Sequence, residues 1–521
     1  MSSIVKTKVG PELFVGLAAA VGTDLEKVIT KLSEALKRVD YQPHPLRLAS
    51  LLKELPDYAG KLTFSPADKY IDTHMTQGNE LRKQTGLNDA LAILAIAEIQ
   101  KQRQEAGLAQ GHILSRCAYI LRSLKHPEEV KTLRNIYGDS FYLVAAYAPH
   151  AQRRDYLARR IASSHNESSA NKYYPEAERL ILRDQEELDL PHGQNLRDTF
   201  HRADVFLDTT DEDTLARSVS RFIELIFGNT LHTPTKGEYV MFHAKAAALR
   251  SAELGRQVGA AIARANGDIV AVGTNEVPRA GGGLYWCDDK PDMREFMRGG
   301  DSNDTHKRNL VADTLMRLQK AGWLNVEMTS LNIKDLVNEA LREESPVLGS
   351  QSLIRNVIEF GRAVHAEMAA IVDAARRGVT IAECAMFVTA FPCHLCARHI
   401  VAAGISKVVY IEPYPKSLTA ELYPDSIKVE GACTDAELVL FEPFVGVAPR
   451  QYMHLFEAGV RKDRTGNAII FNPDKAKPRY SAAERVYLEN EDFVLKKLAD
   501  TINRQGSLFG EKQNDGGGRH A

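Results

Sequence analysis

Four residues in the C-terminal half of the chain have types and spacings that suit metal binding and proton transfer. His365 and Glu367 form an H-x-E pattern, and Cys393 and Cys396 follow Pro392 as P-C-x-x-C. An imidazole and two thiolates are three ligands that suit a tetrahedral Zn²⁺ ion, and the fourth position is then open to water. No fourth Cys or His stands in register to close the site. The spacing therefore predicts one catalytic zinc ion per chain rather than a structural one.

Two predicted helix starts bring these residues to one point. A run of helix formers follows His365, so that His365 and Glu367 lie at the first turn of a helix. Residues 385–391 are predicted to form a buried strand, and a second helix begins at Pro392. The two cysteines are three residues apart, so they share one face of that helix. They lie at its N-terminus, where the helix dipole favours thiolates.

Glu367 is not required as a metal ligand, which leaves it free for proton transfer. We expect it to take a proton from a metal-bound water and to deliver it to the substrate. Taken singly, each residue has a simpler explanation. Glu367 would be a carboxylate that stabilises a helix N-terminus, and the cysteines would be small buried hydrophobic residues. All four residues at these spacings together favour the metal site.

The composition is that of a folded protein with more than one domain. The chain has 521 residues, of which 44% are hydrophobic and 26% charged, and its net charge is -2. This length predicts two or three domains, and the balanced charge argues against a large nonspecific nucleic-acid surface. We see no apolar signal-peptide core, no run long enough to cross a membrane, and too few cysteines for a disulfide framework. These features predict a cytoplasmic protein.

Strands alternate with helices through the N-terminal region. Apolar runs predict the strands, and the runs between them have helical patterns. The predicted strands are 12–17, 45–49, 117–121, 141–147 and 203–208. This alternation predicts an α/β domain with a mostly parallel sheet that is covered by helices on both sides.

The first strand leads through a glycine-containing turn into a helix that begins at Leu25, which is the context of a phosphate-binding loop. Five residues separate Gly16 from Gly22 where the Walker pattern has four, and Thr23-Asp24 replaces Lys-Ser/Thr. By this turn and by its topology the region resembles a P-loop fold of the nucleotide-kinase type. It would be a degenerate relic or a site that binds through backbone N–H groups. Gly16, Gly22 and Thr23 are its candidate nucleotide-binding residues.

The helix predicted after residues 141–147 contains four arginines, Arg153, Arg154, Arg159 and Arg160. In nucleotide kinases a helix in this place supplies arginines to a lid over phosphates, so the resemblance allows a nucleotide clamp. A solvated helix face or an oligomer contact explains the same arginines, and we slightly prefer that explanation.

A turn-rich junction over residues 227–237 marks the predicted domain boundary. We predict a kinase-like domain over 1–228, a second domain over 229–475, and a C-terminal helix with a disordered tail over 476–521. The second domain combines a long helix, strands, the two helices of the metal site and a strand over 407–411, which suggests an α/β/α sandwich.

The motifs of this second domain resemble those of the cytidine and deoxycytidylate deaminases. G-T-N-E-V-P over residues 273–278 precedes H-A-E over 365–367 and P-C-H-L-C over 392–396, as in that family. The fusion to a degenerate kinase-like domain is similar to the bacterial anti-phage deoxycytidine-nucleotide deaminases. Together the two regions cover nearly all of the chain, and the zinc motifs are the more specific part.

This resemblance implies a zinc-dependent deaminase that converts dCTP or dCMP to the deoxyuridine nucleotide and depletes dCTP during phage infection. It implies that His365, Cys393 and Cys396 hold the zinc ion and that Glu367 passes protons to the ring nitrogen and the leaving amine. Asn275 would contact the nucleotide, and the alternative for Asn275 is a turn residue that closes a strand.

Two further segments supply candidate substrate contacts. Residues 276–364 form a long insertion with a glycine run, aromatic residues and many charges, which suits a substrate lid or an oligomer contact. After the strand 407–411, Tyr414, Lys416 and Ser417 are predicted to lie where the site opens. A proline-rich loop without a ligand role is the alternative for these three residues.

The leading hypothesis is a hydrolase that acts on a free deoxycytidine nucleotide. A polynucleotide-editing deaminase is the second, but it needs a basic groove with interleaved aromatic residues, and no such cluster stands out. In the third, the N-terminal domain senses a nucleotide or docks a partner and restrains the deaminase. A regulatory nucleotide, an RNA or a protein inhibitor would serve as that partner. The resemblance and the apolar helices also predict a homo-oligomer.

Overall fold

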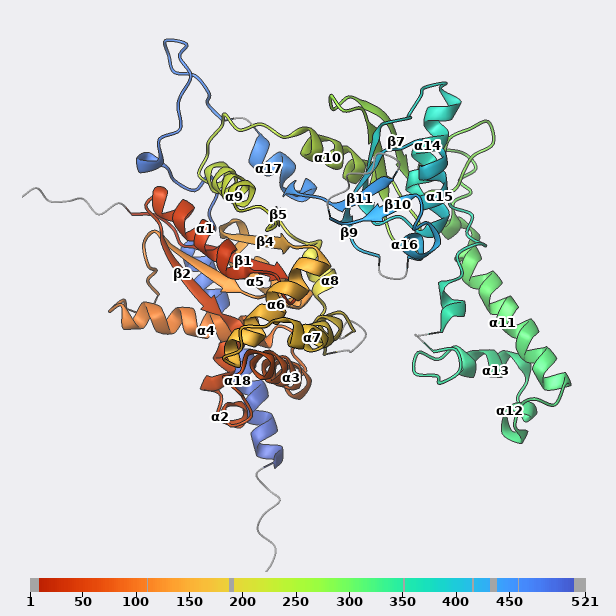
Figure 1. Cartoon of the computed structure of the whole chain (residues 1–521), viewed down its shortest axis with the longest axis horizontal. Coiled ribbons are helices and arrows are strands. Elements are labelled where there is room, and N and C mark those ends of the chain that lie inside the picture. Colours follow the sequence, from red (N-terminus) through yellow and green to blue (C-terminus); the bar gives the residue numbers. More distant parts are fainter. Residues whose placement is uncertain are drawn as a thin grey trace, which may run out of the picture. The chain divides into compact units, whose positions relative to one another are not determined.

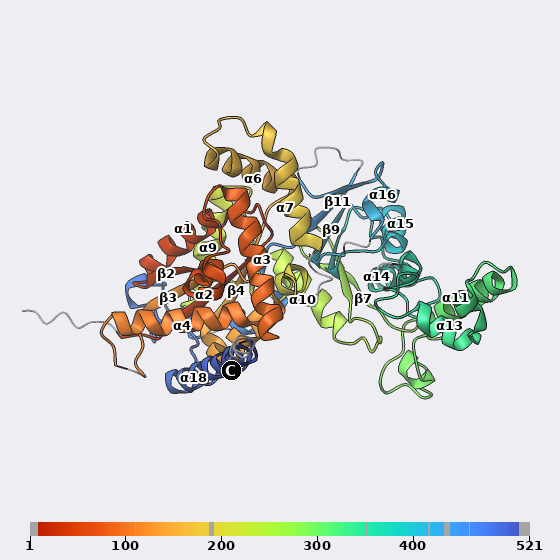
Figure 2. The ribbon, with the colours of Figure 1, turned by 90° about the horizontal axis from the view of Figure 1, so that it is seen from below.

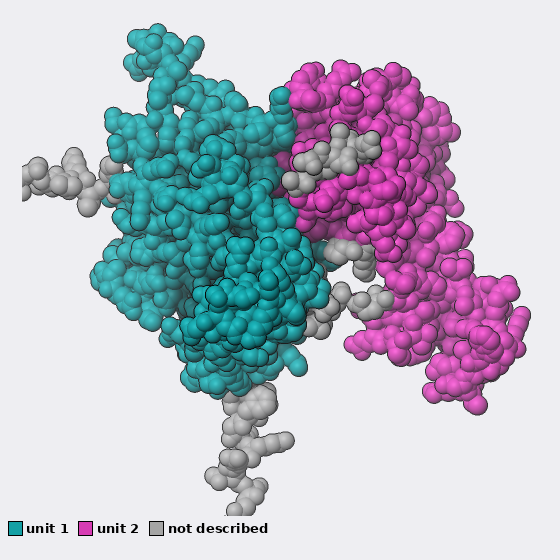
Figure 3. Space-filling model, viewed as in Figure 1, with its two compact units in different colours: residues 1–238, 445–521 teal, residues 239–444 magenta. Residues whose placement is uncertain are grey.

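The computed structural model, drawn as a ribbon in Figure 1 and from a second direction in Figure 2, describes residues 9–109, 111–186, 192–349, 352–414, 417–431, 438–457 and 459–509. The chain forms two compact units, which are coloured separately in Figure 3. Unit 1 comprises residues 1–238 and 445–521, and unit 2 comprises residues 239–444. Within the described ranges, no helix has the length and apolar character needed to cross a membrane.

Unit 1 contains a six-stranded sheet in the order β12-β5-β4-β1-β3-β2, which is parallel except for β12. Its strands are β1 (Leu13–Ala19), β2 (Gln42–Arg47), β3 (Cys117–Arg122), β4 (Phe141–Tyr147), β5 (Val205–Asp208) and β12 (Gly446–Val447). The predicted parallel sheet is confirmed. The strand predicted over 45–49 begins earlier, at Gln42, and lies at the sheet edge, where its prolines are tolerated.

Helices cover both faces of this sheet, as predicted (Figure 1). Leu13 and Val15 of β1 belong to the core that the sheet forms with α1 and α9. Phe14 points the other way, stacks on Tyr137 of α5 with ring centroids 3.6 Å apart, and meets Tyr487 of α18 edge-on. The helices of unit 1 are α1 (Leu25–Arg38), α2 (Pro56–Ala59), α3 (Ala67–Thr85), α4 (Ala90–Glu105), α5 (Pro127–Tyr137), α6 (His150–Ser164), α7 (Tyr174–Glu186), α8 (Leu196–Phe200), α9 (Glu212–Ile226), α17 (Tyr452–Phe456) and α18 (Glu484–Phe509).

A buried charge network anchors the C-terminal helix α18 within unit 1. Arg103 of α4 donates hydrogen bonds to Glu12 and Glu491, each with a shortest N–O distance of 2.7 Å. All three side chains are at most 4% exposed. Tyr137 and Tyr487 donate further hydrogen bonds to Glu491 and Glu12, respectively. Burial raises the pKa of Glu491, and the Arg103 guanidinium opposes that rise.

The boundaries of the two units differ from those of the predicted segments 1–228, 229–475 and 476–521. The first boundary falls after Glu238 rather than after residue 228, and the chain returns to unit 1 at Val445. Two interactions explain the return. Strand β12 pairs antiparallel with β5, and Glu491 of α18 binds Arg103. Of the tail predicted to be disordered, residues 510–521 lie outside the described residues.

Unit 2 contains a second six-stranded sheet, in the order β10-β11-β9-β8-β6-β7. Strand β6 pairs antiparallel with β7 and β8, and the other pairs are parallel. The strands are β6 (Gly259–Ala263), β7 (Ile269–Thr274), β8 (Ala385–Ala390), β9 (Lys407–Glu412), β10 (Ile427–Val429) and β11 (Val439–Pro443). The helices are α10 (Lys236–Ala248), α11 (Ser302–Lys320), α12 (Val326–Ser330), α13 (Ile333–Ala340), α14 (Ala366–Arg376), α15 (His394–Ala402) and α16 (Thr419–Leu422).

The sheet of unit 2 lies between α10 on one face and α14 and α15 on the other (Figure 1). A Cβ atom on Gly259 would lie 2.0 Å from the carbonyl oxygen of Ala244 in α10. The opposite face packs Ala366 and Ala397 of the other two helices against β6, β7 and β8. The predicted α/β/α layering is confirmed. Within the 276–364 insertion, α11 and α13 form a small hydrophobic cluster of their own.

Replacing Arg103 by Met is predicted to destabilise unit 1 strongly. The change leaves Glu12 and Glu491 buried without their cation. Removing one partner of such a group costs about 3–5 kcal/mol. Urea unfolding of the full chain measures the loss. Arg485→Met is the matched control, because Arg485 and Glu489 are 92% and 68% exposed. It should cost less than about 0.5 kcal/mol. Equal unfolding midpoints for the two variants would contradict this account.

Candidate active site

Helix α14 places His365 by lying directly on strand β7. His365 is the N-cap residue of α14, with an extended backbone, so the chain enters the helix immediately after the imidazole. A Cβ atom on Gly273 of β7 would lie only 2.1 Å from the carbonyl oxygen of Ala366. Only glycine allows this approach. The first turn of α14 is thereby fixed against the sheet, and the predicted helix start at His365 and Glu367 is confirmed.

Helix α15 places the two cysteines in the same way. Strand β8 ends at Ala390, Cys393 is the N-cap residue, and Cys396 lies in the first turn. The helix begins at His394, two residues after the predicted start at Pro392. The reason is that Cys393 has the extended backbone of a cap.

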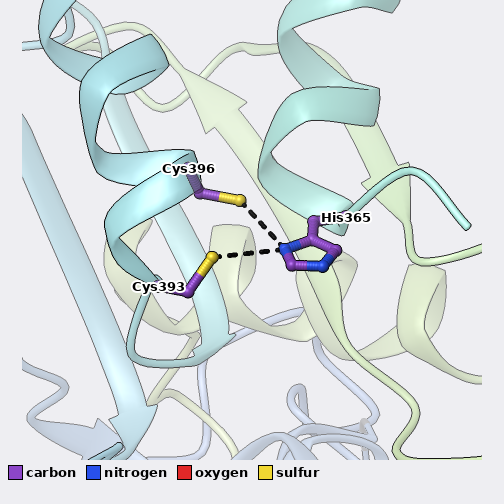
Figure 4. A group of neighbouring side chains, drawn as sticks. All are labelled: His365, Cys393 and Cys396. Atoms are coloured by element: carbon purple, nitrogen blue, oxygen red, sulfur yellow. Dashed lines mark hydrogen bonds between the residues drawn. The ribbon is translucent and has the colours of Figure 1, made fainter. Parts of the chain in front are cut away.

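The three predicted metal ligands converge. The sulfur atoms of Cys393 and Cys396 each lie 3.3 Å from Nδ1 of His365, as Figure 4 shows. All three ligand atoms lie within 4.8 Å of one another. Tetrahedral Zn²⁺ with ordinary Zn–N and Zn–S bonds separates a nitrogen from a sulfur by about 3.5 Å. The donor set and its spacing therefore fit zinc with little movement.

Hydrogen bonds link these three side chains and shift their pKa values. The hydrogen bond with Cys396 lowers the pKa of Cys393 to about 4, and the same bond raises the pKa of Cys396 well above its ordinary value. The hydrogen bond to Cys393 raises the pKa of His365 to about 9. The three groups therefore compete for protons through these contacts. A metal ion needs the deprotonated ligands, so its binding would release these protons.

Glu367 lies in the first turn of α14, beside the ligand cluster. Its side chain is 4% exposed, and burial followed by the charge of Cys393 raises its pKa. A buried carboxyl with a raised pKa holds a proton more readily than an exposed one, which suits general acid–base chemistry. The structure therefore combines a three-ligand cluster with a proton carrier that is not one of the ligands.

A pocket of about 280 Å³ joins this cluster to two of the predicted substrate residues. Its walls include Asn275, Tyr414, Glu367 and two of the ligands, His365 and Cys393. The remaining lining residues include Arg256, Ile358 and Phe391. Apolar walls around a few convergent polar groups are typical of a small-molecule site.

Asn275 and Tyr414 are both at this pocket, but they are held differently. The Asn275 amide donates to the Arg256 carbonyl at 2.6 Å and accepts from the Val258 N–H at 2.8 Å. It thus shapes the loop before β6. Burial raises the pKa of Tyr414, and the Arg256 guanidinium lies 5.4 Å from the centre of its ring.

The other predicted residues lie away from this pocket or outside the described residues. Ser417 donates to the Pro392 carbonyl at 2.8 Å, so it supports the turn that carries Cys393. Lys416 falls outside the described residues. Gly16, Gly22 and Thr23 belong to unit 1, and Gly16 lies inside β1 rather than in the loop.

Sequence reasoning missed Arg256 and Ile358. Arg256 forms an ion pair with Glu412 at the end of β9, and Ile358 comes from the 276–364 insertion. The position of Arg256, just before an apolar strand, was visible in the sequence. Its proximity to the cysteines was not, because it depends on the antiparallel pairing of β6 with β8.

Comparison with known proteins identifies the region that carries this site. Residues 234–412 match the cytidine and deoxycytidylate deaminase zinc-binding region. This match supports the deaminase family for the part of the chain that holds all three ligands and Glu367. We refer to residues 234–412 as the deaminase region.

Relatives and solved structures are similar over parts of the chain. The deoxycytidylate deaminase of Enterobacteria phage T2 is 48% identical over 54 residues, which are 10% of this chain and 29% of that protein. ComE operon protein 2 of Bacillus subtilis (strain 168) is 31% identical over 99 residues, which are 19% of this chain and 50% of that protein. The chain thus spans half or less of these relatives.

A crystal structure of dCMP deaminase from the cyanophage S-TIM5, in complex with dCMP and dUMP, is 18% identical. The alignment covers 40% of this chain and 98% of that one, with a TM-score of 0.22. A likeness at this TM-score gives no support for a shared fold.

Replacing Cys393 by Ser is predicted to remove zinc from the protein. The change deletes one of the three ligand atoms, and serine is a poor substitute for a thiolate. Elemental analysis of purified protein should give about one zinc per chain for the wild type and much less for the variant. Cys287→Ser is the control, because Cys287 is exposed and is not one of the three ligands. Full zinc content in Cys393→Ser, with a native circular-dichroism spectrum, would refute the site.

Proposed function

We propose that this chain is a zinc-dependent hydrolase that deaminates deoxycytidine nucleotides, dCMP or dCTP, to deoxyuridine nucleotides. The C4–NH₂ bond of cytosine is broken, water supplies the new carbonyl oxygen, and ammonia leaves. The observation that carries the proposal is the convergence of His365, Cys393 and Cys396 beside the buried carboxyl of Glu367. The match of the deaminase region supports it.

Each residue has a definite task in this reaction. His365, Cys393 and Cys396 would hold one zinc ion, which supplies the Lewis acid that activates water. Glu367 accepts one proton of the attacking water and passes it to N3 of the ring, and it then carries the second proton of that water to the leaving amine nitrogen. Its burial limits contact with competing water and raises its pKa.

The pocket walls suit a pyrimidine nucleotide. Phe391 and Ile358 supply apolar surface for the base, and Tyr414 closes the wall beside Arg256. Arg256 is 49% exposed at its side chain, so its guanidinium can exchange Glu412 for a phosphate at the mouth of the pocket. This placement favours a nucleotide over a nucleoside.

The resemblance of the sequence motifs adds a biological proposal to the chemical one. We propose that the reaction depletes dCTP during phage infection and that the chain acts as a homo-oligomer. The kinase-like character of unit 1 is supported by its parallel sheet and by the strand-turn-helix at residues 13–38.

Replacing Glu367 by Gln is predicted to abolish turnover without loss of zinc. The amide keeps the shape of the side chain but cannot carry the proton, so kcat should fall by at least about 10²-fold. Ammonia release and product mass are measured with cytidine, dCMP, dCTP and CTP. Glu421→Gln, an exposed carboxyl in α16, is the control and should keep wild-type kcat. No turnover of any of the four substrates by zinc-loaded wild type would contradict the proposal and favour a polynucleotide substrate.

Replacing Arg256 by Gln is predicted to weaken binding of the nucleotide selectively. We expect the KM for dCMP or dCTP to rise about ten-fold, because one charge-assisted hydrogen bond to phosphate is lost, while deoxycytidine kinetics stay unchanged. Arg264→Gln is the matched control, since Arg264 is exposed at the opposite end of β6. An equal rise in KM for nucleoside and nucleotide would show that Arg256 does not bind the phosphate.

A further inference from the structure

Unit 1 has a second pocket, of about 170 Å³, at the carboxyl ends of its parallel strands. Ala19 ends β1, Arg47 ends β2 and Arg122 ends β3, and all three line this pocket. Ligands of parallel α/β sheets commonly bind at this edge. None of the residues of this pocket takes part in the proposed deamination.

Several backbone N–H groups around the turn between β1 and α1 already have partners within the protein. Asp24 caps α1 and accepts from the N–H groups of Glu26 and Lys27. The Val21 N–H donates to Asp184 at 2.8 Å, and Asp184 also binds Lys125. The N–H groups of Val21, Glu26 and Lys27 are therefore not available to cradle a phosphate.

Three arginines instead surround the pocket. Arg47 and Arg122 share the Glu26 carboxylate, whose side chain is 59% exposed. Arg160 of α6 has no hydrogen bond or ion pair to any described residue, and burial, together with the charges of Arg47 and Arg122, lowers its pKa. Three guanidinium groups with one exposed carboxylate between them leave an uncompensated positive charge. This charge suits an anion with several oxygen atoms, such as a phosphate.

Three buried polar atoms of pocket-lining residues also have no hydrogen-bond partner among the described residues. They are Oγ1 of Thr23, Nε2 of His74 and Nε of Arg82. The three residues are 7%, 4% and 2% exposed, respectively. Buried polar atoms are rarely left unpaired in a folded protein, so each one indicates a missing partner. A polar ligand in this pocket would supply the partners.

His74 specifies part of that ligand's chemistry. Its Nδ1 lies 2.7 Å from the carbonyl oxygen of Tyr70, so Nδ1 carries the proton. Burial lowers the pKa of His74, which keeps the ring neutral and leaves Nε2 as an acceptor. The ligand must therefore present an N–H or O–H group here. Tyr70, Ile71 and Met75 add apolar lining around it.

We propose that this pocket of unit 1 binds a nucleoside phosphate, with its phosphate on Arg47, Arg122 and Arg160 and a hydrogen-bond donor of its base on Nε2 of His74. The combination of a cationic end, an apolar wall and a neutral acceptor matches the three parts of such a ligand. The site is separate from the deaminase pocket and does not depend on zinc.

The test is binding of nucleotides to the full chain by isothermal titration calorimetry. Purine and thymine nucleoside mono- and triphosphates are titrated beside pyrophosphate and inorganic phosphate, because the deaminase pocket is proposed for cytosine nucleotides. At least one nucleoside phosphate should bind, and Arg160→Gln should weaken it about ten-fold or more. His74→Phe should weaken the nucleotide but not pyrophosphate. Arg47→Gln is a second variant in case Arg160→Gln does not fold.

Two controls locate the binding. Arg159→Gln changes the exposed neighbour of Arg160 on α6, and Arg256→Gln changes the deaminase pocket. Both should bind as the wild type does. Absence of binding by every nucleoside phosphate would overturn the proposal, as would wild-type affinity in Arg160→Gln and Arg47→Gln. Pyrophosphate binding as tight as that of the best nucleotide would overturn the assignment of a base to His74. None of these outcomes bears on the turnover of cytosine nucleotides, which is measured separately.

Discussion

Helix α14 lies so close to strand β7 that only a glycine fits between them, and the metal cluster depends on this approach. A Cβ atom on Gly273 would meet the Ala366 carbonyl oxygen at 2.1 Å and the Ala370 nitrogen at 2.4 Å. On the opposite face, the absence of a Cβ atom on Gly259 lets α10 approach β6 equally closely. Since β6 and β7 pair side by side, the two glycines let helices clamp this hairpin from both sides. The position of His365 follows from that clamp.

The second requirement is that another helix begins beside the first. Strand β8 ends just before α15 starts, and the caps of α14 and α15 lie together there, since the Cys393 sulfur is 3.3 Å from His365 Nδ1. Both helix N-termini favour negative groups, which here are a thiolate and a carboxylate. Burial has the opposite effect from the helix dipole on Glu367, because burial raises the pKa of this carboxyl. The outcome is a site that holds both metal ligands and an exchangeable proton.

The sequence was sufficient for the parts of the site that are local. Cys393 and Cys396 are three residues apart, so helix geometry alone places them on one face, and His365 and Glu367 are near neighbours at a single helix start. The role of Arg256 could not be predicted in this way, because its place beside Tyr414 depends on the register of β6 with β8. Gly16 was predicted to be the first glycine of a phosphate-binding pattern. It lies in β1, where Leu124 and Phe141 leave no room for a Cβ atom.

Long-range partners explain the remaining differences in the fold. Glu491 binds Arg103 across 388 residues of sequence, a separation at which composition and periodicity carry no information. This ion pair brings the C-terminal helix into unit 1, whereas a helix followed by a tail was predicted as a separate segment. The alternation of strands and helices did predict the parallel sheet, because that pattern is a property of neighbouring elements.

X-ray absorption at the zinc edge of the purified protein tests the central claim most directly. The account predicts two sulfur ligands at about 2.3 Å and two nitrogen or oxygen ligands at about 2.0–2.1 Å, which are His365 and one exchangeable ligand. Addition of the product dUMP should alter the signal of the light ligands and leave the two sulfurs unchanged. A third sulfur, a second histidine that persists with product, or a protein that binds no zinc would contradict an open catalytic site at His365, Cys393 and Cys396.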